Sequence, residues 1–132
     1  MSTIELKLTL VNLRDDGIMH VHIKEHAHIT MAEAMETLKA MRVIGSGHKY
    51  PVLIDSGEFA IIDPDVRVFS ASEEGNLYTV ADAIAYHTLP QKLTANFYVS
   101  YNKPVVPTRT FSEMREAIDW LKTFVTPGQK AG

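Results

Sequence analysis

The chain has 132 residues, no cysteine and a formal net charge of −3 with its histidines neutral. This length suits one domain with one hydrophobic core, and the missing cysteines exclude disulfides, thiolate nucleophiles and sulfur-ligated zinc. Basic residues form no cluster, so we expect no nucleic-acid binding. No apolar window approaches the ~20 residues of a membrane span, and the N-terminus lacks the pattern of a signal peptide. We therefore expect a soluble cytoplasmic protein.

The N-terminal part of the chain predicts a β-hairpin and then a helix. Polar and apolar residues alternate in Ile4–Leu10 and again in Met19–Ile23, and the turn residues Arg14–Gly17 lie between these strands. The apolar spacing then becomes helical, and Thr30 and Glu33 have the spacing of a capping box. These patterns predict an antiparallel hairpin that precedes the first helix.

The remaining elements alternate between strand and helix. They are a strand at Tyr50–Asp55, a helix from Asp63 to Gly75, a strand at Thr79–His87, a helix within Thr88–Tyr101, a strand within Lys103–Phe111 and a helix from Ser112 to Phe124. The alanines of the second of these strands leave helix as an alternative there. The order predicts an α/β fold with about five strands in a mostly parallel sheet, an N-terminal antiparallel hairpin and four helices. We expect a single domain at 1–126 and a flexible tail at 127–132.

Three segments carry a resemblance to a known family. They are "YPVLIDSGEFAIIDPDVRVF", "ADAIAYHTLPQKLTANFYV" and "VPTRTFSEMREAIDWLKTF". In this order and spacing they resemble the STAS domain, named for sulphate transporters and anti-sigma-factor antagonists. More narrowly, the chain is similar to the small SpoIIAA-like (STAS and CRAL-TRIO-like) proteins of bacteria, over roughly Leu8 to Phe124. The resemblance implies a SpoIIAA-like fold.

The resemblance also implies a protein-binding surface at the start of the second helix. In anti-sigma-factor antagonists a serine there is phosphorylated, and by position Asp63 matches the family's aspartate while Pro64 replaces the serine. Because proline has no hydroxyl, we expect partner binding that is not switched by phosphorylation at this position. The partner-binding residues that the resemblance implies are Asp63, Pro64, Asp65, Arg67 and Val68. The "DSG" at 55–57 is interpreted as the exit of a strand.

The histidines are the weak candidates for a metal site. His20 and His22 are two residues apart on a predicted strand, so both rings point to one face. That face is interpreted as the solvated side of the sheet, and we expect no tightly bound metal there. His87 follows a strand near the carboxyl-end loops that carry Asp55 and Asp63, where an acid–base contact is conceivable, but we favour unrelated polar loop residues.

Three functions remain open. The first is a non-enzymatic STAS-like interaction module with an unknown protein partner and no cofactor, marked by an exposed apolar patch around Pro64 to Phe69. The alternative is a carrier of a small apolar, lipid-like molecule, which a closed apolar cavity beneath the second and third helices would favour. A metal-dependent enzyme that uses His20 and His22 is the weaker alternative. The aromatic residues Phe97, Tyr98 and Tyr101 cover more than one helical face and leave a homodimer open.

Overall fold

The computed structural model describes residues 2–126. Six strands form the main sheet, and two short strands, β4 and β6, pair with each other separately. The strands are β1 (Thr3–Glu5), β2 (Thr9–Leu13), β3 (Met19–Ile23), β4 (His28–Ile29), β5 (Tyr50–Ser56), β6 (Ile61–Ile62), β7 (Thr79–Ala85) and β8 (Thr108–Phe111). The helices are α1 (Met31–Ile44), α2 (Pro64–Ala71), α3 (Leu89–Phe97) and α4 (Met114–Lys122), with a 3₁₀ turn η1 (Glu74–Asn76) and a π-helical turn η2 (Tyr98–Asn102).

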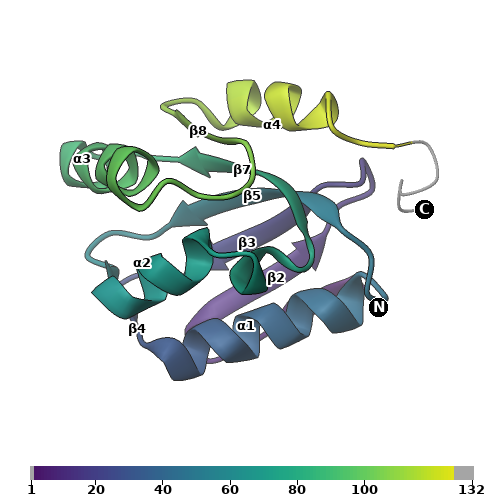
Figure 1. Cartoon of the computed structure of the whole chain (residues 1–132), viewed down its shortest axis with the longest axis horizontal. Helices are drawn as coiled ribbons and strands as arrows, with labels where there is room; N and C mark the ends of the chain where they lie inside the picture. Colours follow the sequence, from purple (N-terminus) through teal and green to yellow (C-terminus); the bar gives the residue numbers. More distant parts are fainter. Residues whose placement is uncertain (1, 127–132) are drawn as a thin grey trace.

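The main sheet has the order β1-β2-β3-β5-β7-β8, antiparallel from β1 to β3 and parallel from β3 to β8. The three parallel crossovers step in the same direction, so right-handed connections place α1, α2 and α3 on one face. Figure 1 shows α4 on one side of the sheet and α1 and α2 on the other. The predicted α/β fold, with a largely parallel sheet, an N-terminal antiparallel hairpin and four helices, is confirmed.

Side chains that alternate along the strands supply a core to each face of the sheet. On one face, Val21 and Val52 pack in a cluster with Met41 of α1. On the other face, Leu53 packs in a cluster with Leu121 of α4. The alanines of β7 at 81, 83 and 85 belong to this second cluster, because their small side chains let α4 lie close to the sheet. The alanine-rich segment is therefore a strand, as predicted.

The ends of several elements differ from the predictions. The predicted first strand folds back on itself, because a bond from the Leu6 N–H to the Thr9 carbonyl (2.8 Å) closes a turn between β1 and β2. Strict alternation does not reveal such a turn, so the sheet gains one strand. Helix α2 ends at Ala71, before Gly75, and Glu113 precedes α4 in place of Ser112. The predicted tail lies outside the described residues.

No helix within residues 2–126 combines the length and the apolar character needed to cross a membrane.

Candidate functional site

A large cavity lies between the sheet and the helices α1, α2 and α3. Its volume is about 600 Å³, and it is partly open to solvent. The walls are mostly apolar and include Val21, Val52, Ile54, Ile84, Met41 and Val66. Sites for small molecules typically measure about 300 to 1,000 Å³ and have mainly hydrophobic walls. The volume and lining are thus those of a ligand site, and the cavity is partly open, whereas a closed one was named as the feature that would favour the carrier alternative.

Polar bonds hold the helices that roof this cavity. Gln91 of α3 donates from Nε2 to the Ser56 carbonyl at 3.2 Å and accepts from the His87 N–H at 2.7 Å. Arg67 of α2 donates from Nη1 to the Ile62 carbonyl at 2.7 Å. Both Gln91 and Arg67 line the cavity. These bonds fix the starts of α2 and α3 relative to the loops that precede them.

Asp82 is the unusual group of the cavity wall. It lies in the middle of β7, only 6% of its surface is exposed, and it is part of the cavity lining. Its carboxyl group forms no hydrogen bond or ion pair with any residue of the described chain. Burial raises the pKa of Asp82 to about 7. Because buried polar groups in native proteins are nearly always paired, an unpaired carboxyl that faces a cavity indicates a functional position.

Tyr98 brings a second polar group to the same cavity. It starts the π-helical turn η2 that follows α3, and it lines the cavity. Burial, together with the charge of Asp82, raises the pKa of the Tyr98 hydroxyl above its ordinary value. The phenol is therefore a neutral hydrogen-bond donor and acceptor at physiological pH. Asp82 and Tyr98 are thus two polar groups in a mostly apolar cavity lining.

A second group of polar side chains lies on the opposite face of the sheet. Asp55 of β5 accepts hydrogen bonds at Oδ1 from His20 Nε2 (2.7 Å) and His22 Nδ1 (3.1 Å) of β3. His22 and Asp55 are register partners in the parallel pair, and His20 is two residues earlier on the same face. His87 lies beyond β7 with its Nε2 3.9 Å from Asp55 Oδ2. The structure thus joins three of the sequence candidates around one carboxylate.

Asp55 has the opposite electrostatic situation to Asp82. Burial acts to raise the pKa of Asp55, but the hydrogen bonds and charges of His20 and His22 outweigh burial and lower it. The two imidazoles are half-buried, so the interpretation of this face as simply solvated is corrected. The pairing of Asp55 with His20 and His22 could not be predicted from local patterns, because Asp55 is more than 30 residues from both histidines.

The residues proposed for partner binding at the start of α2 have separate roles. Asp63 occupies the N-cap position, but its side chain makes no cap bond and instead accepts a hydrogen bond from His28 Nε2 at 2.6 Å. Pro64 and Asp65 are exposed, and so is Val68, whereas Arg67 belongs to the cavity wall.

Helix α3 carries an exposed apolar stripe. Leu89, Leu93 and Phe97 are spaced four residues apart and are each about half or more exposed, and Tyr101 stacks on Phe97 with 4.9 Å between ring centroids. Tyr98 points to the other side, into the cavity lining. The expected two-sided character of this aromatic cluster is therefore present.

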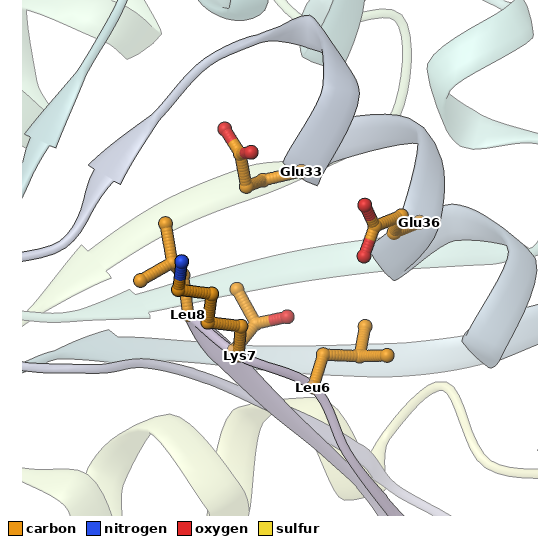
Figure 2. Close-up of a pocket in the computed structure, with 6 residues that line it drawn as sticks. Leu6, Lys7, Leu8, Glu33 and Glu36 are labelled. Carbon is orange, nitrogen blue, oxygen red and sulfur yellow. The ribbon is translucent and has the colours of Figure 1, made fainter.

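A much smaller pocket of about 130 Å³ lies where the turn between β1 and β2 meets α1. Figure 2 shows Glu33 and Glu36 on α1 across the pocket from the segment with Leu6, Lys7 and Leu8. The Glu33 carboxylate already has hydrogen-bond partners, because its Oε1 accepts hydrogen bonds from the backbone N–H (2.8 Å) and the hydroxyl (2.6 Å) of Thr30. These bonds fulfil the predicted capping of α1 and leave no separate role for the pocket.

Comparisons with known proteins agree with this fold. The chain belongs to the family described as "Domain of unknown function (DUF7793)", whose model matches residues 11–125. Among curated proteins, none matches the sequence. A solved structure of an uncharacterised DUF3478-family protein with a SpoIIAA-like fold, from Shewanella loihica PV-4, is similar with a TM-score of 0.54 and 14% identity, over 91% of this chain and 90% of that chain. A protein of unknown function from Arthrobacter sp. FB24 is 24% identical over 84% of this chain and 96% of that chain, with a TM-score of 0.30. The predicted SpoIIAA-like fold is thus confirmed.

Proposed function

We propose that this DUF7793 chain binds a small, mostly apolar molecule in the cavity beneath α2 and α3, with Asp82 as its polar anchor. The observation that carries the proposal is a cavity of about 600 Å³ whose wall contains a buried carboxyl group with no partner among residues 2–126. Apolar walls with a few fixed polar groups are the usual construction of a ligand site. A ligand that carries a hydroxyl or an amine would supply the missing hydrogen bond to Asp82.

The proposal is tested by filling the cavity without changing its polarity. Ile84 is on the same strand as Asp82, two residues away, and lines the cavity, so Ile84→Phe should occupy the space that a ligand needs. We expect the neutral fluorescent probe N-phenyl-1-naphthylamine to bind the wild-type protein and to bind Ile84→Phe at least tenfold more weakly. The matched control is Ile61→Phe, because Ile61 is 61% exposed on β6. Equal probe binding by the two variants would refute the cavity as the site.

A second candidate is a non-enzymatic STAS-like interaction module, and the exposed stripe of Leu89, Leu93 and Phe97 on α3 favours it. Apolar patches that stay exposed often mark protein–protein contacts. Binding should not depend on phosphorylation at the start of α2, because Pro64 has no hydroxyl. Asp63 and Asp65 already place negative charge at this helix start, where it interacts favourably with the helix dipole.

Pull-down of an endogenous partner, with and without phosphatase, tests the second candidate. We expect equal recovery in both samples, and a loss of recovery for Leu93→Ser but not for the control Leu77→Ser, since Leu77 is also about half exposed but lies outside α3. Recovery that requires phosphorylation of Ser56, Ser70 or Ser72 would contradict a phosphorylation-independent module.

A further inference from the structure

The geometry points to a transition-metal site formed by His20, His22 and Asp55, on the face of the sheet opposite the cavity. This inference uses neither Asp82 nor Tyr98 of the proposed ligand site, although Asp55 is also among the residues that line the cavity. The ion class is Zn²⁺, Co²⁺ or Ni²⁺, for which two imidazole nitrogens and one carboxylate oxygen are suitable ligands. Hard ions such as Ca²⁺ prefer six or more oxygen ligands, which this cluster does not provide.

The spacing of the three ligand atoms fits such an ion. One nitrogen from each histidine and one oxygen of Asp55 all lie within 4.8 Å of one another. Metal bonds of about 2.0 to 2.2 Å place neighbouring ligand atoms roughly 3 to 3.5 Å apart. The observed contacts to Asp55 Oδ1 are 2.7 Å from His20 Nε2 and 3.1 Å from His22 Nδ1. The two histidine–carboxylate contacts are therefore already close to the spacing of neighbouring metal ligands.

The backbone holds these side chains in place without a metal. Parallel pairing sets His22 beside Asp55 and His20 beside Leu53, so the sheet fixes where each side chain begins. The side chains of His20 and His22 remain 24% and 35% exposed, which leaves a path for an ion from solvent. Ligands on adjacent strands of a sheet are positioned more precisely than ligands on loops.

His87 lies beside this cluster but is not part of it. Its Nε2 lies 3.9 Å from Asp55 Oδ2, and its side chain is half exposed on the loop after β7. Among the described residues, the group of ligand atoms within 4.8 Å of one another comprises His20, His22 and Asp55 and does not include His87.

The first test uses the wild-type chain, purified without an affinity tag and stripped with a chelator. Zn²⁺ is added while the ring nitrogens of all histidines are followed by ¹⁵N NMR. We expect saturation at one equivalent, with the main shifts at His20 Nε2 and His22 Nδ1, and no shift with Ca²⁺. Zinc shifts confined to His26, His28 or His48, or no saturable shift at all, would overturn the proposal.

Variants then test the ligands one at a time. Asp55→Asn and His20→Gln should each weaken Zn²⁺ binding by at least about tenfold, the loss that follows even from removing a group that only supports a ligand. The matched control is His48→Gln, because His48 is exposed in the segment after α1 and outside the cluster. Circular dichroism confirms that each variant is folded, and the absorption of bound Co²⁺ reports a changed ligand set in those that still bind. Zinc affinity unchanged in both cluster variants would exclude these residues as ligands.

Discussion

Two carboxylates on adjacent parallel strands have opposite environments. Asp55 of β5 lies on the α4 side of the sheet and accepts hydrogen bonds from two histidines, which lower its pKa despite burial. Asp82 of β7 lies on the side of α1 and α2, where it has no partner within residues 2–126 and burial raises its pKa to about 7. Both carboxyl groups are buried, so the presence or absence of hydrogen-bond partners decides whether the pKa is lowered or raised.

The difference also separates two kinds of function. A carboxylate that is already paired with imidazoles belongs to a preformed polar cluster, in which an ion can replace protons. A carboxyl group that is buried and unpaired in an apolar cavity reduces stability and is tolerated where a ligand pairs with it. The same sheet therefore carries a polar cluster on one face and, on the other, a mostly apolar cavity whose buried carboxyl group is Asp82.

The largest expected effect is that of Asp82→Asn on stability. The folded protein holds the Asp82 proton up to about pH 7, whereas the unfolded chain loses it near pH 4. The free energy of unfolding of the wild type should therefore fall as pH rises from about 4 to 7, by about 1.4 kcal/mol per pH unit, and then level off. Asparagine removes this titration, so the variant should gain stability over the wild type by up to about 4 kcal/mol at pH 8.

Urea unfolding at a series of pH values measures this difference in the free energy of unfolding between Asp82→Asn and the wild type. Asp119→Asn is the matched control, because Asp119 is exposed on α4. The control should differ from the wild type by less than about 0.5 kcal/mol throughout. If the free energies of unfolding of Asp82→Asn and the wild type differed by the same amount from pH 4 to 8, the pKa of Asp82 would not be raised by folding. Asp82 would then be either solvated or paired.

A smaller effect of opposite sign is expected for Asp55→Asn. The change weakens two hydrogen bonds to a charged acceptor, so it should lower the free energy of unfolding by about 1 to 3 kcal/mol at pH 7. Because the pKa of Asp55 is lowered on folding, its contribution is present above about pH 4 and is lost as the pH falls through the lowered value. Denaturation of the metal-free protein at pH 7 measures the loss of stability, and denaturation at pH 3 shows whether that loss becomes smaller in acid. A variant as stable as the wild type at pH 7 would mean that the hydrogen bonds from His20 and His22 to Asp55 contribute nothing to stability.

The sequence predicted the fold well because periodicity records which face of each element is buried. Alternation identified β3, and the helix predicted from Asp63 begins at Pro64 in the structure. The turn that divides β1 from β2 escaped prediction, because folding a strand back on itself leaves the alternation unchanged.

The candidate site was predicted only in part, because it depends on contacts between distant segments. His20 and His22 were identified as neighbours on one face, but Asp55 was interpreted as a turn residue. Asp82 did leave a signal, as the single charge in the otherwise apolar run "TVADAIA" of a buried strand. The cavity itself depends on how far α2 and α3 stand from the sheet, and no residue pattern encodes that distance. The expectation of no tightly bound metal stays a prediction that the zinc titration will decide.

The smallest expected effect is that of His87→Gln in the metal-free protein. His87 is half exposed and its Nε2 is 3.9 Å from Asp55 Oδ2, beyond hydrogen-bond distance. An exposed charge pair of this kind contributes at most about 0.5 to 1 kcal/mol, so the variant should unfold within about 0.5 kcal/mol of the wild type at pH 7. His20→Gln, measured beside it, should cost more, because His20 makes the 2.7 Å bond to Asp55 Oδ1. A loss for His87→Gln as large as that for His20→Gln would show that Asp55 is held from three sides in solution, and the cluster would then include the loop after β7 even without a metal.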